Sequence, residues 1–196
     1  MEDYRNRASK VLPRFVFEFV DGGAEHETCL RANREDFERI RLTPRVLRDT
    51  REVDASVEVY GSVWRQPFAL APTGLNGVIR PGGDGMLARA AAEMGVPFVQ
   101  STASNQRAED VRAIAGGGEQ WLQLYVMQDR RLAEQLVRRA RAADYRALVL
   151  TADVPVGGRR WRDVRNGFSM PFRITPRIAW DVARRPGWAL RMLRGG

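Results

Sequence analysis

Four short apolar runs, spaced at regular intervals, decide the fold: FALAPTG (68–74), VPFVQST (96–102), WLQLYV (121–126) and ALVLTAD (147–153). Their first residues lie 28, 25 and 26 positions apart. Helical patterns fill the gaps, at 84–94, 107–114 and 130–143. Strands alternating with helices at this spacing predict βαβ units and a parallel sheet. Each run is continuously apolar, as expected for a strand that helices cover. The predicted class is therefore α/β.

Upstream of these runs the sequence predicts short helices and a hairpin. Residues 3–11 and 13–20 read as helices, the second opening with Pro13 at a helix-start position. A polar helical pattern follows at 24–38, after a Gly-Gly pair. The alternating segments 57–61 and 62–67 then indicate a small hairpin.

Polar residues follow each predicted strand. They are Thr73; Ser101 and Thr102; Gln123 and Tyr125; and Thr151 and Asp153. In a right-handed βαβ series these strand ends share one edge of the sheet, and α/β folds bind their ligands there. The pattern alone leaves a second interpretation open, in which these residues merely cap strand ends that face solvent.

Several chemistries lack their sequence signatures. No G-x-G-x-x-G follows a strand and no phosphate-binding P-loop motif is present. Gly82–Gly85 before a helix could cradle an anion, but a turn with a helix cap is the favoured interpretation. His26 is interpreted as a surface residue of a polar helix. The single Cys29 excludes a disulfide framework and a thiolate metal cluster, so no metal site is expected.

The N-terminus does not read as a signal peptide, and no apolar run approaches the roughly 20 residues of a membrane span. The expected location is cytoplasmic, with peripheral binding to the inner face of the cytoplasmic membrane as an extension. Residues 156–196 hold ten arginines and two aspartates, a net charge of +8 that equals the charge of the whole chain. The basic character is therefore confined to the C-terminal segment.

Five segments, taken in order, resemble one enzyme family: LPRFVFEFVDGGAEHE (12–27), APTGLNG (71–77), QSTASN (100–105), QLYV (123–126) and LTADVPVGGRRWRDVRNGF (150–168). The resemblance is to the FMN-dependent 2-hydroxy-acid dehydrogenases and oxidases, closest to the mandelate and lactate dehydrogenase branch. It implies a (β/α)8 TIM barrel, of which about the first four βα units are present. The implied domains are N-terminal helices and hairpin (1–66), half of the FMN-binding barrel (67–165) and a basic amphipathic segment (166–196).

The resemblance also assigns roles. The backbone of Pro72, Thr73 and Gly74 would lie against the flavin ring, while hydrogen bonds to its polar edge would come from three side chains, those of Ser101, Gln123 and Thr151. Placed donors of this kind tune a flavin that gains negative charge on reduction.

Three residues would act on the substrate side. The Tyr125 hydroxyl would face the substrate, the planar fork of Arg160 would pair with its carboxylate, and Asp153 would orient the catalytic histidine. Taken without the family, Arg160 belongs to a solvated basic loop and Asp153 caps a strand. The family tyrosine that contacts the substrate carboxylate is Phe19 here.

The implied activity is oxidation of a mandelate- or lactate-like 2-hydroxy acid to the 2-oxo acid, with electrons passing to a membrane acceptor, a quinone rather than oxygen. The family histidine, lysine, second arginine and phosphate site have no counterpart here, so the chain is expected to be inactive alone. Its expected partners are the missing C-terminal half or, in the intact enzyme, further copies of itself. The alternatives are a non-catalytic flavin-fold remnant and a complementing half-subunit.

Aromatic residues among the arginines of 166–196 favour an anionic membrane surface as a further partner. A plain structural loop over the barrel and a nucleic-acid contact are the alternatives for this segment; we expect no nucleic acid as a partner.

Overall fold

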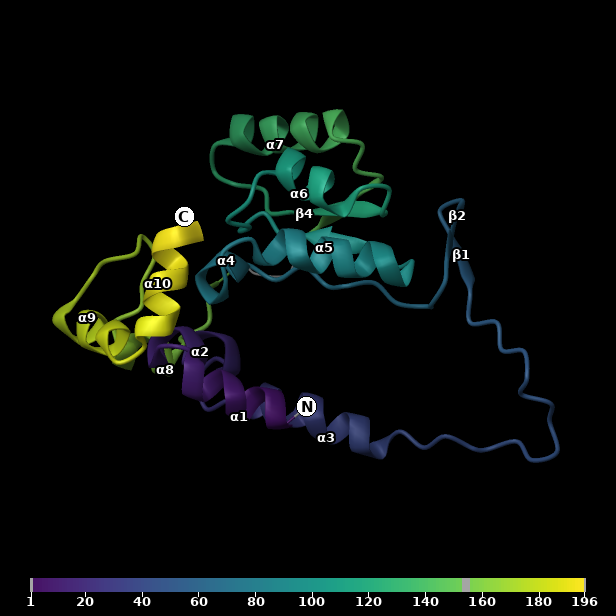
Figure 1. Ribbon diagram of the computed structural model, residues 1–196, viewed down its shortest axis with the longest axis horizontal. Helices are drawn as coiled ribbons and strands as arrows, with labels where there is room; N and C mark the ends of the chain where they lie inside the picture. Colours follow the sequence, from purple (N-terminus) through teal and green to yellow (C-terminus); the bar gives the residue numbers. More distant parts are fainter. Residues whose placement is uncertain (1, 153–155, 196) are drawn as a thin grey trace. The chain divides into compact units, whose positions relative to one another are not determined.

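The computed structural model describes residues 2–152 and 156–195 (Figure 1). Its contacts divide the chain into two compact units, and each is described separately. The sheet unit comprises residues 52–155, and the helical unit comprises residues 1–51 together with 156–194.

A parallel sheet forms the centre of the sheet unit. Its strands are β3 (Phe98–Gln100), β4 (Gln120–Leu124) and β5 (Ala147–Leu150), hydrogen-bonded in the order β3-β4-β5. The predicted strand at 68–74 is reduced to one parallel bridge, in which Leu70 pairs with Phe98. Leu70 donates to Pro97 and accepts from Val99, but Pro72 has no N–H with which to continue the ladder.

Helices follow the strands at the predicted places: α5 (Gly83–Met94), α6 (Ala108–Ala115) and α7 (Arg130–Ala142), with a short α4 (Asn76–Ile79) that the sequence did not reveal. Figure 1 shows α6 between α5 and α7. Small residues on α5 and α6 let the two helices pack closely, and the buried core consists of Ala88, Ala91, Val96, Phe98, Val111 and Ala115, with the partly buried Leu70 packed against it. The prediction of βαβ units in a parallel sheet is confirmed.

The predicted hairpin is also confirmed. β1 (Val57–Val59) pairs antiparallel with β2 (Ser62–Trp64), and both turn residues, Tyr60 and Gly61, have positive φ. Two positive φ values are typical of a type I′ turn, whose twist matches that of the strands. Trp64 packs edge-on against Trp121 with ring centroids 5.4 Å apart, which anchors the hairpin to β4.

The helical unit consists of α1 (Glu2–Val11), α2 (Arg14–Asp21), α3 (Thr28–Arg39), α8 (Trp161–Asn166), α9 (Pro176–Ala183) and α10 (Pro186–Gly195). Pro186 opens α10 and separates it from α9, whereas α8 was not predicted from the sequence. Phe15 of α2 is 2% exposed and lies against the rings of Phe168 and Trp188, with centroids 5.7 and 6.1 Å away. Residues far apart in sequence thus share one small core.

The two units cut across the three segments that the sequence suggested, 1–66, 67–165 and 166–196. The hairpin belongs with the sheet, and the basic C-terminal segment belongs with the N-terminal helices. Aromatic burial around Phe15 accounts for the second grouping, because Phe168, Ile178 and Trp188 are all buried.

Candidate active site

A row of hydrogen-bonded side chains crosses the carboxyl edge of the parallel sheet. Ser101 follows β3, Gln123 lies in β4 and Thr151 follows β5. The Ser101 hydroxyl donates to Gln123 Oε1 at 3.2 Å, and Gln123 Nε2 donates to the Thr151 hydroxyl at 2.8 Å. The structure therefore brings together the three side chains that the sequence placed at one edge.

The orientation of the Gln123 amide is fixed by its neighbours. The backbone N–H of Thr102 donates to Oε1 at 3.1 Å, and a backbone N–H cannot accept, so this atom must be the oxygen. The amide nitrogen then faces Thr151. Gln123 is 4% exposed and Ser101 is 6% exposed, so both side chains are buried in the fold. Gln123 Nε2 carries a second hydrogen, and the Thr151 hydroxyl can still donate.

A second polar cluster ties the loop at 71–77 to the loop after β3. Asn76 Nδ2 donates to the Thr73 carbonyl at 3.1 Å and to Asp84 Oδ1 at 2.8 Å. The hydroxyl of Ser104 donates to the other oxygen of Asp84 at 2.7 Å. Asp84 is only 1% exposed, so a single buried carboxylate fastens both loops.

The same cluster continues to Tyr145, which lies between α7 and β5. Gln100 Nε2 donates to the Ser104 hydroxyl at 2.9 Å, and the Tyr145 hydroxyl donates to Gln100 Oε1. Burial raises the pKa of the Tyr145 phenol, which keeps the donor protonated. No pattern in the sequence assigned these residues to the site. Asp84 was assigned to a capping turn; Gly82 does precede α5 in the left-handed region, but the carboxylate bonds to side chains instead of the helix backbone.

Two further predicted residues of the sheet unit, Gly74 and Tyr125, lie beside this row. Gly74 approaches the loop after β3 closely, because a Cβ there would stand 3.0 Å from the Cβ of Ala103. Tyr125 follows β4, and its backbone N–H donates to the Thr102 hydroxyl at 3.1 Å. Its side chain is 43% exposed and can meet a ligand.

Arg160 lies in the helical unit, at the start of α8, and holds the end of α2. Its Nε donates to Asp163 at 2.6 Å, and its Nη2 donates to the carbonyl oxygens of Phe19 and Gly22. The guanidinium also lies over the Phe19 ring, 5.0 Å from its centroid. Arg160 is thus no freely solvated loop residue. Of its three nitrogens, only Nη1 forms no hydrogen bond with the described residues.

Asp153 lies outside the described residues. His26 is exposed, as expected for a surface residue, but it lies in the turn before α3 and not in the predicted polar helix. In residues 2–152 and 156–195 no group of His, Cys, Asp and Glu side chains could hold a metal ion.

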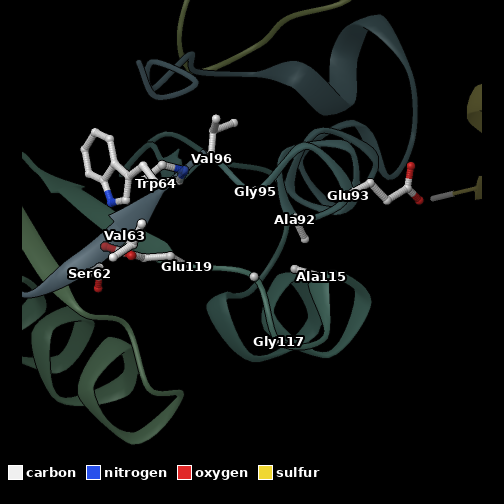
Figure 2. Close-up of a pocket in the computed structure, with 12 residues that line it drawn as sticks. Ser62, Val63, Trp64, Ala92, Glu93, Gly95, Val96, Ala115, Gly117 and Glu119 are labelled. Atoms are coloured by element: carbon white, nitrogen blue, oxygen red, sulfur yellow. The ribbon is translucent and has the colours of Figure 1, made fainter. Parts of the chain in front are cut away.

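A pocket of about 590 Å³ lies at the opposite, amino-terminal edge of the sheet and contains none of the predicted site residues (Figure 2). Trp64 and Val63 of the hairpin form one wall, and Ala92 and Ala115 from the ends of α5 and α6 form the other. The polar row and this pocket are therefore separate features of one sheet.

Comparison with known proteins identifies the family. The model of the family described as FMN-dependent dehydrogenase matches residues 8–195. This chain belongs to that family. The (S)-mandelate dehydrogenase of Pseudomonas putida is 41% identical over 196 residues, which are all of this chain and 49% of that protein. The L-lactate dehydrogenase of Vibrio parahaemolyticus serotype O3:K6 is 40% identical over 96% of this chain and 49% of its own length.

Solved structures of family members superpose closely on this chain. A crystal structure described as the monotopic membrane protein (S)-mandelate dehydrogenase superposes with a TM-score of 0.91 at 41% identity, covering all of this chain and 52% of that one. A mandelate oxidase superposes with a TM-score of 0.80 at 36% identity, over 95% of this chain and 58% of that one. The family resemblance and its mandelate and lactate branch are confirmed. The chain spans about half the length of the curated relatives that it matches.

The donor set at the sheet edge fits the cofactor for which the FMN-dependent dehydrogenase family is named. A flavin presents carbonyl oxygens and ring nitrogens along one edge, and the amide of Gln123 and the hydroxyl of Thr151 supply donors on neighbouring strands. Gly74 leaves its loop without a side chain beside them. The residues present at this edge are therefore chemically suited to the polar edge of a flavin.

Proposed function

We propose that this chain supplies the first four βα units of an eight-stranded barrel that oxidises a mandelate- or lactate-like 2-hydroxy acid to the 2-oxo acid. The observation that carries the proposal is the Ser101–Gln123–Thr151 row, a set of oriented donors at the edge where α/β barrels bind ligands. When bound, FMN supplies the acceptor for the hydride equivalent that leaves the α-carbon. The residues of the protein bind and orient the cofactor and the substrate.

On the cofactor side, three strand-end side chains hold the polar edge of the ring. Ser101 orients the Gln123 carboxamide, which in turn fixes the Thr151 hydroxyl, so that donors are in place before the ligand arrives. The backbone of Pro72, Thr73 and Gly74 forms the surface against the ring face. Asp84 anchors that loop through Asn76.

On the substrate side, Tyr125 presents its hydroxyl to the substrate and Arg160 binds the carboxylate. Since Nε and Nη2 of Arg160 already hold Asp163 and the end of α2, Nη1 is the nitrogen left for the substrate. Asp153 would orient a histidine supplied by the other half of the barrel and stabilise its charged form after proton removal.

The chain is proposed to act with a C-terminal half and to be inactive without it. β5 is an edge strand among the described residues, and Leu148 and Leu150 on it are 48% and 62% exposed. An unpaired edge with exposed apolar side chains is the surface that the next strand of a barrel would cover. The exposed edge therefore favours completion of the barrel by a second half over a non-catalytic remnant.

The test combines this chain with the remaining half of the Pseudomonas putida relative. We expect the mixture to retain yellow flavin absorbance after gel filtration and to reduce a dye when mandelate is added, and the chain alone to reduce none. Thr151→Val and Gln123→Leu should abolish flavin retention, whereas Gln128→Leu, an exposed control four residues after β4, should not. Flavin retention that is unchanged by both site variants would refute the assignment.

We also propose peripheral binding to an anionic membrane surface, on the cytoplasmic side, with a membrane quinone as electron acceptor. Among the described residues no helix is long and apolar enough to cross a bilayer. Large apolar side chains are nevertheless exposed along the basic segment: Met170, Phe172, Ile174, Trp180, Leu190 and Leu193. Apolar residues among arginines favour the interfacial region of a membrane.

A further inference from the structure

A basic pocket of about 320 Å³ lies within the helical unit, beside the start of α2 and along α9. Four of its eight lining residues are arginines: Arg14, Arg177, Arg184 and Arg185. None of them was singled out by the sequence motifs, and none belongs to the site described above.

The sequence spacing along α9 explains why two of these arginine side chains lie on the same side of the helix. Arg177, Trp180 and Arg184 stand at positions i, i+3 and i+7, and such residues share one face of a helix. Ile178 is 1% exposed and anchors α9 in the core. The face with Arg177 and Arg184 is therefore held in place by a buried neighbour.

Two of the four arginines are already engaged. Arg14 pairs with Glu18 at 2.8 Å, and Arg185 donates to the carbonyl of Leu12 at 3.1 Å. The acidic residue of the lining, Asp181, accepts the backbone N–H of Phe15 at 3.0 Å and so caps α2. Its carboxylate thereby serves a structural role.

Arg177 and Arg184 remain available to a ligand, with Asp181 as the acidic residue of the same lining. Within residues 2–152 and 156–195 neither guanidinium forms an ion pair or a side-chain hydrogen bond. Two planar guanidinium groups that face one pocket can each direct paired N–H groups at the oxygens of a phosphate. The Trp180 side chain between them is 67% exposed, and an indole ring with a polar N–H suits the level of lipid headgroups.

We propose that this pocket binds a phosphate group, that of an anionic lipid headgroup. The proposal deepens the membrane association proposed above and rests on it for the source of the phosphate. A soluble phosphate ester has the same chemistry, so the experiment must separate the two sources.

The test measures flotation of the full chain with phosphatidylglycerol vesicles and with phosphatidylcholine vesicles, and calorimetric binding of glycerol phosphate. The double variant Arg177→Gln/Arg184→Gln should weaken binding to phosphatidylglycerol and glycerol phosphate at least about tenfold, because hydrogen bonds to charged groups are lost. The matched control Arg191→Gln/Arg194→Gln removes two exposed charges from α10 of the same segment and should change binding less than about threefold.

A charge-preserving variant separates a built site from diffuse attraction. Arg177→Lys/Arg184→Lys keeps the net charge but loses the planar forks, and we expect it to weaken glycerol phosphate binding about threefold or more. Circular dichroism checks that each variant remains folded, which is expected because both side chains are exposed.

Equal losses in the pocket and control variants, or no loss in either, would overturn the pocket and leave membrane association intact. Binding of glycerol phosphate without flotation would support the phosphate site and refute the membrane proposal. Flotation that the pocket variant alone loses, together with loss of glycerol phosphate binding, would support both.

Discussion

The buried carboxylate of Asp84 offers the sharpest test of how the candidate site is held. Asp84→Asn keeps the shape of the side chain but replaces one oxygen by an NH2 group. Asp84 accepts from Asn76 and from Ser104, and the Ser104 hydroxyl itself accepts from Gln100 Nε2 and from the Gln106 backbone N–H. Both acceptor sites of that hydroxyl are therefore used, so the new NH2 group finds no acceptor at Ser104. One hydrogen bond to a charged group is lost, at a cost of about 2 kcal/mol.

Urea denaturation of this chain, followed by tryptophan fluorescence, measures that cost. The matched control is Asp110→Asn, which also removes a carboxylate from the first turn of a helix. Asp110 pairs with Arg107 at 2.8 Å, with side chains 44% and 72% exposed, so its loss should cost less than about 1 kcal/mol. If Asp84→Asn lowers the free energy of unfolding by no more than the control, the reasoning that this carboxylate fastens the two loops is wrong.

Three further outcomes are expected. In the reconstituted enzyme Phe19→Tyr should lower the Michaelis constant for a 2-hydroxy acid about tenfold, because its hydroxyl adds a bond to the carboxylate; an unchanged constant would count against the alignment. Hydrogen bonds from Arg5 and Arg162 lower the pKa of Asp21 in the folded state. The ionised carboxylate therefore stabilises the fold fully above its ordinary pKa of 3.8, and this stabilisation is lost as the pH falls through the lowered pKa. In acid unfolding experiments we expect Asp21→Asn to make the free energy of unfolding less dependent on pH in that range. Gly77→Ala should cost about 1–3 kcal/mol in thermal unfolding because its Cβ would lie 2.6 Å from that of Asn105, whereas Gly117→Ala, with open space around it, should be nearly neutral.

The local pattern of the sequence was sufficient for most of the sheet unit. Continuous apolar runs located β3, β4 and β5, and the helices between them began and ended within a residue or two of the predicted bounds. The first predicted strand was overestimated, since Pro72 interrupts its ladder after Leu70. The grouping of the C-terminal segment with α2 could not be predicted, because it depends on long-range burial of Phe15 against Phe168 and Trp188.

The candidate site was likewise only partly predictable from the sequence. Strand periodicity placed Ser101, Gln123 and Thr151 at one edge, and the structure joins them by hydrogen bonds. The supporting role of the Asp84 carboxylate could not be predicted from the sequence, because an acidic residue after two glycines is most simply interpreted as a helix cap. Its partners come from two other loops, and only the tertiary fold reveals that they converge.

The contacts of Arg160 bear on how a substrate can be held. The carbonyl oxygens at the end of a helix need donors, and Nη2 of Arg160 supplies them to Phe19 and Gly22 at the end of α2. The same N–H groups cannot also form a two-point fork with a carboxylate, which leaves Nη1 and a single-point contact. The Phe19 ring beneath the guanidinium adds no donor of its own. Under the proposed role of Arg160, a tyrosine at that position would supply a second contact to the carboxylate without releasing α2, and we therefore expect Phe19→Tyr to tighten substrate binding.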